Sequence, residues 1–225
     1  MPVVVTTAAQ TTDLVDLETV KTYLQIAGND QDAVLASLIS QASSSCVGYL
    51  QRPLALQEYR ERISIRGRRQ SAINLSVGPI AAIRSIAVDG RAVTFLDEMF
   101  VSRDKARLDD PYHAPVTGDW ACKARQVEIT YLAGFLLQGM DQPEKKDTDL
   151  LPLEVTVLPN DIVGGVLGTI QMLRYGQGRD PLLKSESVQG VGSTTWQSMD
   201  ASVGAISPDA IAALDRLVIA ADWMA

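Results

Sequence analysis

The feature that most constrains the fold is a change of hydrophobic period along the chain. Apolar residues recur at helical spacing from residue 16 to residue 52, then alternate with polar residues from about residue 56, and return to helical spacing after residue 158. Each period suits one kind of element, so the order is two helices, a β-rich middle and two more helices. The sequence therefore predicts an α+β fold: a four-helix core made of two helical pairs, with a small antiparallel β domain inserted between them.

The first two predicted helices form an αα-hairpin. Asp16 is a suitable N-cap for the helix that carries Leu17, Val20 and Leu24. A second apolar stripe follows the turn at 27–30, and Arg52-Pro53 ends it. Its members are Val34, Leu35, Leu38, Ile39, Ala42, Cys46, Tyr49 and Leu50.

In the middle of the chain the period is two. Tyr59, Ile63 and Ile65 share one face of a predicted strand, whereas Arg60, Arg62 and Arg66 share the other. Asp89-Gly90 is a hairpin turn signal, and Val127, Ile129 and Tyr131 mark the last clear strand. We expect about five or six short strands here.

The last two helices are predicted to begin at Leu158-Pro159 and at Ser207-Pro208-Asp209. Gly164, Gly165 and Gly168 lie inside the first of them, and each costs about 1 kcal/mol relative to alanine. Such glycines are tolerated more easily where another backbone packs closely.

These signals predict four regions. They are an extended N-terminal arm (1–14), a helical core (15–55 and 150–225), an inserted β-rich domain (56–139) and a charged surface loop (140–149).

The composition argues against several functions. The net charge of -7 disfavours a protein that grips DNA phosphates, and the aromatic content of 5% disfavours a base-stacking surface. The N-terminus lacks a signal-peptide pattern, and we expect no membrane span. Cys46 and Cys122 match no metal spacing, and nothing suggests a disulfide scaffold, so we expect a reducing cytosol.

No catalytic pattern stands out either. His113 is the single histidine, and it lies near Asp109, Asp110 and Asp119, which leaves a small enzyme site there as an alternative. We predict that the chain is not an enzyme and that it needs no cofactor and no metal.

Two segments are candidates for interaction. Arg66, Arg68 and Arg69 concentrate positive charge at a predicted hairpin tip, which is either solvated or docks on acidic protein or phosphate. The polar stretch 183–196, which ends at Trp196, is either a flexible linker or a shaped docking loop.

Several short sequence stretches together resemble the phage head-tail connector family, also called head completion or DNA-packaging adaptor proteins. They are the stretches 17–26, 30–42 and 47–52, then 78–86 and 127–134, then Leu158-Pro-Asn-Asp-Ile162 with Arg174-Tyr175, and finally Lys184-Ser-Glu-Ser-Val188 with Ile206-Ser-Pro-Asp-Ala-Ile211. The sequence departs from the family in its charged excursion at 140–149 and in Trp196.

The resemblance implies a virion protein of the neck, made in the cytoplasm of the host bacterium. It implies a ring, most simply of twelve copies, that binds the portal on one side and a stopper or tail-completion protein on the other. Packaged DNA would pass through the channel with weak contact. Docking candidates are then Lys184, Ser185, Glu186, Ser187, Val188 and Trp196, with Trp223 as an anchor near the C-terminus. A stopper or terminator protein is the alternative within the same particle.

Overall fold

The computed structural model describes residues 3–65, 72–96, 98–109, 125–176, 185–188, 192–195 and 206–217. They divide into two compact units. The helical unit comprises the described residues of Asp13–Arg52 and Pro159–Val218, and the β unit comprises those of Met1–Thr12 and Pro53–Leu158. The domain limits expected from sequence remain our proposal.

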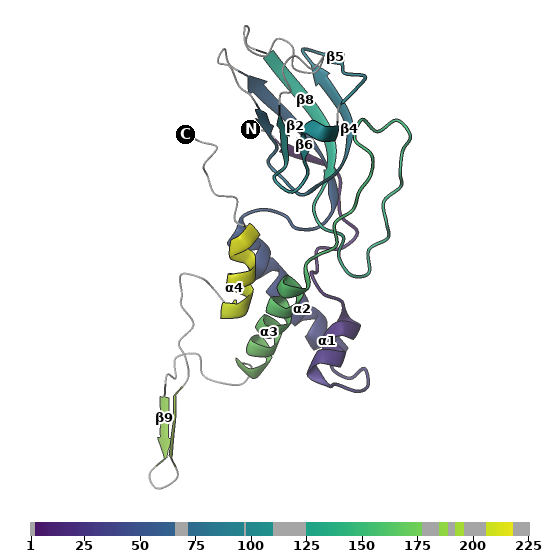
Figure 1. The fold of residues 1–225 in the computed structure, drawn as a ribbon. Coiled ribbons are helices and arrows are strands. Elements are labelled where there is room, and N and C mark those ends of the chain that lie inside the picture. Colours follow the sequence, from purple (N-terminus) through teal and green to yellow (C-terminus); the bar gives the residue numbers. More distant parts are fainter. Residues whose placement is uncertain are drawn as a thin grey trace. The chain divides into compact units, whose positions relative to one another are not determined.

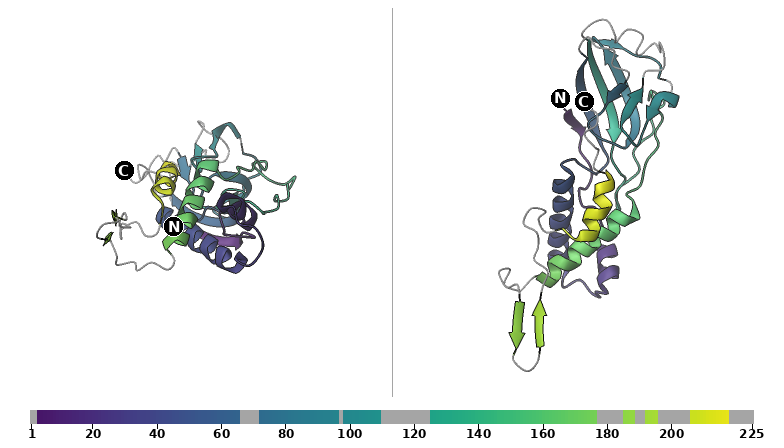
Figure 2. Two further views of the ribbon diagram at one scale, coloured as in Figure 1. Left: turned by 90° about the horizontal axis from the view of Figure 1, so that it is seen from below. Right: turned by 60° about the vertical axis from the view of Figure 1, so that its left-hand side comes forward.

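The helical unit contains four described helices: α1 (Leu17–Leu24), α2 (Asp32–Leu50), α3 (Asn160–Gly176) and α4 (Pro208–Leu214), the last continued by the 3-10 turn η2 (Asp215–Leu217). Helix α3 contacts each of the other three, and Figures 1 and 2 show α2, α3 and α4 side by side. The helices therefore form one group around α3 rather than two separate pairs.

The predicted helix starts are confirmed where polar caps mark them. The Asp16 carboxylate accepts a hydrogen bond from Thr19 N at 2.8 Å, and Ser207 Oγ accepts one from Ala210 N at 3.2 Å with Pro208 in the first turn. Both side chains satisfy backbone donors that a helix start otherwise leaves unpaired.

Helix α2 is long and apolar enough, by length and composition, to cross a membrane. Its apolar face is nevertheless occupied inside the helical unit. Leu35, Leu38, Ile39, Ala42 and Cys46 are all buried, and α2 packs against α1, α3 and α4. Core packing therefore accounts for the apolar composition of this helix.

The β unit is built on a five-stranded antiparallel sheet (Figure 1). Its strand order is β1 (Val3–Thr7), β2 (Gln57–Ile65), β8 (Arg125–Ala133), β4 (Ile80–Val88) and β5 (Arg91–Ala92). Strands β2 and β8 pair over nine residues, from Gln57 opposite Ala133 to Ile65 opposite Arg125. The predicted Asp89-Gly90 turn joins β4 and β5, with both residues at positive φ.

A second antiparallel sheet has the order β3 (Ala72–Asn74), β7 (Arg107–Asp109) and β6 (Val101–Ser102), and the 3-10 turn η1 (Glu98–Phe100) precedes β6. The main core of the β unit draws on both sheets. It includes Tyr59, Ile63, Ile129 and Tyr131 from the large sheet and Leu108 from the small one. The predicted alternation is confirmed, because Tyr59 and Ile63 are buried whereas Arg60 and Arg62 are exposed.

The segment after β8, residues 134–158, also belongs to the β unit. Leu151 joins it to Ile83 of β4 through a single β-bridge, and a second bridge pairs Leu136 with Val157 within the segment. Its side chains Leu136, Met140, Leu153 and Val155 cover a smaller apolar cluster. That cluster consists of Leu56, Ala81, Ala82 and Leu132.

The predicted fold, a four-helix core with a small inserted β domain, is therefore wrong. The β unit is larger than the predicted inserted domain, because it includes the N-terminal strand β1 and the whole of 134–158 besides the alternating middle. The reason is physical. Residues 3–7 and 134–158 gain their hydrogen bonds and burial from distant strands, so their local pattern carries no strand period.

Candidate interaction surfaces

The predicted docking stretch is partly within the described residues. Ser185, Glu186, Ser187 and Val188 form β9 (Ser185–Val188), which pairs with β10 (Gly192–Thr195). The register is antiparallel and regular, from Gly192 opposite Val188 to Thr195 opposite Ser185. We call this two-stranded sheet the β9–β10 ribbon. Its role in docking stays a prediction.

The other predicted interaction residues lie outside the described residues. They are Arg66, Arg68 and Arg69 of the basic tip, together with Lys184, Trp196 and Trp223.

The contact between α3 and α4 explains one of the three helix glycines, Gly165, whereas a β-carbon at Gly168 would make only an ordinary contact. A β-carbon on Gly165 would lie 2.5 Å from Ala210 Cα, and one on Gly168 would lie 3.4 Å from Ser207 Oγ. Gly164, by contrast, faces open space. The close approach expected from the sequence thus exists at Gly165, where only glycine leaves room for the α4 backbone.

A buried hydroxyl cluster reinforces this contact, and sequence reasoning missed it. Ser207 Oγ lies 3.0 Å from the Gly165 carbonyl oxygen, and Ser207 N donates to Thr169 Oγ1 at 3.1 Å. Thr169 and Ser207 are both buried, so these bonds are shielded from water. One serine therefore both caps α4 and fixes α4 against α3.

Exposed apolar side chains of the helical unit gather where α1, α2 and α3 meet. Tyr23, Val34 and Tyr175 are the large exposed apolar residues among its described residues. Tyr23 Oη donates to Gln171 one turn before Tyr175, and Arg174 donates to Gln31 one turn before Val34. Val34 was predicted to belong to the buried stripe of α2, but it is 48% exposed.

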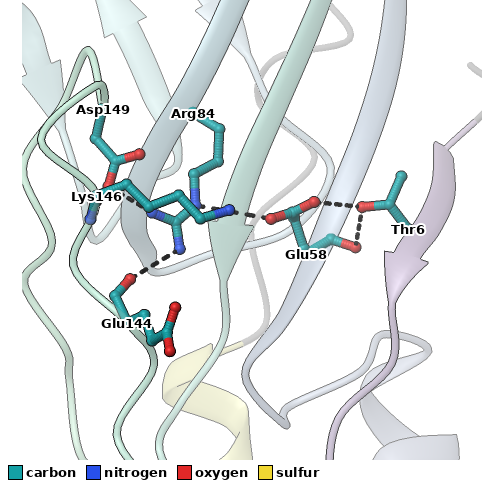
Figure 3. Close-up of polar contacts among 6 residues, drawn as sticks. All are labelled: Thr6, Glu58, Arg84, Glu144, Lys146 and Asp149. Carbon is teal, nitrogen blue, oxygen red and sulfur yellow. Dashed lines mark hydrogen bonds and ion pairs between the residues drawn. The ribbon is translucent and has the colours of Figure 1, made fainter.

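In the β unit, Arg84 organises a polar network that joins four elements (Figure 3). Arg84 on β4 forms ion pairs with Asp149 of the 134–158 segment and, at 3.6 Å, with Glu58 on β2. Glu58 in turn accepts a hydrogen bond from Thr6 Oγ1 of β1 at 2.9 Å. The side chain of Asp149 is only 2% exposed, so the end of the predicted charged loop is anchored on the sheet.

A second missed feature is Glu61, which is fully buried between the sheets. Its carboxyl group accepts hydrogen bonds from Tyr131 Oη at 2.8 Å, Ser76 Oγ at 2.6 Å and Ser76 N at 3.0 Å. Burial, followed by the neighbouring Glu61, raises the pKa of Tyr131. The sequence could have indicated this burial, because strand alternation places Glu61 on the same inward face as Tyr59 and Ile63.

Strand β1 forms one edge of the large sheet. Val4 and Val5 are 50% and 46% exposed, and no residue of the strand is charged. The predicted extended arm is thus a strand whose outer side is open within the described part of the chain.

The described residues contain no group of three or more His, Cys, Asp or Glu side chains that could hold a metal ion. Of the alternative enzyme site, Asp109 is described and pairs with Arg107 at 2.5 Å, whereas Asp110, His113 and Asp119 lie outside the described residues. A hollow of about 400 Å³ at the α1–α2 turn includes Lys21 in its lining, but that lysine is already paired with Asp32 at 2.7 Å.

Comparison with solved structures gives related folds. A chain in the neck of an empty GTA particle, computed with C6 symmetry, is 15% identical with a TM-score of 0.50. The match covers 96% of this chain and 95% of that chain. A chain in the neck of a native GTA particle, computed with C12 symmetry, is 16% identical over 96% and 94% of the two chains, with a TM-score of 0.46. At 15% identity, the likeness to the first of these chains shows a shared fold and no more.

Comparison with curated proteins finds no match. A protein-family model, described as the phage gp6-like head-tail connector protein, matches residues 14–91. That segment spans α1, α2 and the sheet strands as far as the Asp89-Gly90 turn. The predicted resemblance is confirmed over this segment, because residues 14–91 are similar to the phage gp6-like head-tail connector protein family.

Proposed function

We propose that this protein is a structural, non-enzymatic head-tail connector in the neck of a phage-like particle. The observation that carries the proposal is the family match over residues 14–91, which is to a connector protein and not to an enzyme. The fold shared with a chain of a GTA particle neck supports the same location. The absence of a metal-binding cluster from the described residues is compatible with this role.

The connector acts as a ring in this proposal. A head-to-tail ring needs two different complementary surfaces on each copy, and the two compact units offer distinct surfaces for this. We propose twelve copies on the strength of the family resemblance. The C6 symmetry of the neck that contains the related chain is compatible with that number.

The portal is the proposed partner on one side of the ring, and a stopper or tail-completion protein is the partner on the other. Docking is assigned to Lys184–Val188, Trp196 and Trp223. DNA passes through the channel. A chain of net charge -7 suits a conduit, because few neutralised phosphates mean weak binding that lets DNA slide.

Co-expression with the portal protein of the same particle tests this function. The mass of the purified chain is measured alone and with portal, since a connector can be monomeric until the portal templates its ring. We expect a complex with a fixed number of copies per portal. A chain that stays monomeric with portal present, or particles whose heads and tails join normally without it, would contradict the proposal.

The basic tip has a separate test. Reversal of Arg66, Arg68 and Arg69 to glutamate is expected to impair assembly or DNA passage while leaving the circular dichroism spectrum unchanged. Infectious particles at the normal yield would show that the tip is only a solvated turn.

A further inference from the structure

One edge strand of the large sheet, β1, carries neither a charge nor a proline, although its register with β2 shifts between Val5 and Thr7. The edges of this sheet are β1 and β5, and β5 is only two residues long. Strand β1 has five residues, Val-Val-Val-Thr-Thr, with no charge and no proline. Proteins normally shield edges with charges, prolines or very short strands, because a free edge invites another strand. Strand β1 therefore has the character of a pairing site.

One side of β1 is already used. It pairs antiparallel with β2, with Val4 opposite Arg60 and Val5 opposite Tyr59. The backbone groups on the other side have no neighbouring strand in the described chain. The Thr6 hydroxyl, bonded to Glu58 of the Arg84 network, holds β1 onto the sheet. The edge is thus a fixed template rather than a fraying terminus.

The β9–β10 ribbon is the complementary element. It is a sheet of two four-residue strands, and the described residues supply no third strand. Two-stranded sheets are marginally stable alone in water, so a third strand would stabilise this one. Strand β10, Gly-Ser-Thr-Thr, is uncharged like β1, whereas β9 carries Glu186. Two uncharged edges can pair without burying or opposing a charge.

We propose that β10 of one copy adds to β1 of a second copy, extending its five-stranded sheet by main-chain hydrogen bonds. This rests on the proposed ring, which sets identical copies side by side. A head-to-tail contact joins two different surfaces of the same chain, and the β1 edge with the β9–β10 ribbon is such a pair. The ribbon thereby acquires a specific partner: the neighbouring subunit's N-terminal strand.

Cysteine cross-linking in assembled particles tests the pairing. Val4→Cys is combined with Ser193→Cys or Thr194→Cys in a Cys122→Ser background, because successive strand residues point to opposite faces and one of the two faces Val4. The remaining Cys46 is buried. Directly opposed residues on paired strands lie about 4.5–5.5 Å apart between β-carbons, within reach of a short bis-thiol reagent. We expect a ladder of covalent multimers.

Arg91→Cys on the opposite edge strand β5, with the same β10 cysteines, is the matched control and should give monomers. A second measurement, hydrogen exchange, should show amides of residues 3–7 slowing on assembly. A cross-linked species of monomer mass would mean pairing within one chain and overturn the second-copy assignment. Particles that contain the chain but give no cross-link and no slowing would overturn the pairing itself. Absence of the chain from particles would instead refute the proposed function, and this inference with it.

Discussion

Gly165 of α3 lies so close to Ala210 of α4 that a β-carbon on the glycine would be 2.5 Å from the alanine Cα. The obstructing atom is backbone and cannot rotate away. Gly165→Ala is therefore expected to force the helices apart and to destabilise the protein by about 1–3 kcal/mol. Urea unfolding of the variant measures the loss.

Gly164→Ala is the matched control, one position away on the same helix. Its β-carbon would meet nothing within 4 Å, and alanine is the better helix former. This variant should be stabilised by about 0.5–1 kcal/mol. Equal effects at the two positions would contradict the α3–α4 packing.

Arg84 neutralises the nearly buried carboxylate of Asp149. Arg84→Ala should cost about 3–5 kcal/mol, because it leaves that charge without its partner in a shielded site. Arg62 provides a control on the same sheet: it pairs with Glu128 at 2.7 Å but is 58% exposed. Arg62→Ala should cost no more than about 1 kcal/mol. Thermal unfolding of the two variants compares them directly, and similar losses would show that the Arg84 network contributes little.

Removal of Glu61 should destabilise the β unit, because buried groups donate hydrogen bonds to the Glu61 carboxyl group. Glu61→Ala leaves Tyr131 Oη and both donors of Ser76 without their acceptor in a buried site. Each stranded donor costs about 1–3 kcal/mol, so severe destabilisation is expected. Combining Glu61→Leu with Tyr131→Phe removes one donor as well as the acceptor and should be milder than Glu61→Ala. Hydrogen exchange of the β2 and β8 amides reports the outcome.

Alkaline pH should weaken the fold through Cys46. Burial raises the pKa of this thiol from about 9 to about 11. Between these values the unfolded chain loses the proton while the folded chain keeps it, so stability present below pH 9 is lost as pH rises toward 11. Cys46→Ala should be less stable overall yet show a flatter profile across this window. Urea midpoints at pH 8, 9, 10 and 11 check it, and parallel profiles for the two proteins would rule the mechanism out.

The same burial predicts poor reactivity. In a Cys122→Ser background, the folded protein should resist maleimide at pH 7.5 and become labelled only after unfolding in urea, since a buried neutral thiol is a weak nucleophile. Rapid labelling of the folded protein would show that α2 opens away from its packing.

Local signals predicted well wherever the cause was local. Asp16 and Ser207 cap helices through bonds to residues three positions on, and Asp89-Gly90 turns between adjacent strands. Tyr59 and Ile63 face inward because side chains alternate along a strand. The family resemblance could also be recognised from the sequence, and the family model matches residues 14–91.

What the sequence determined by itself was therefore the type of most elements and the resemblance of residues 14–91 to the connector family. Only the tertiary structure decided how large the β unit is, where 134–158 packs, and which glycine of α3 lies against the backbone of α4. The physical reason is that Arg84 and Asp149 are 65 residues apart, and Gly165 and Ser207 are 42 residues apart, yet each pair forms contacts. Such contacts form after chain folding brings distant segments together, and no local period records them.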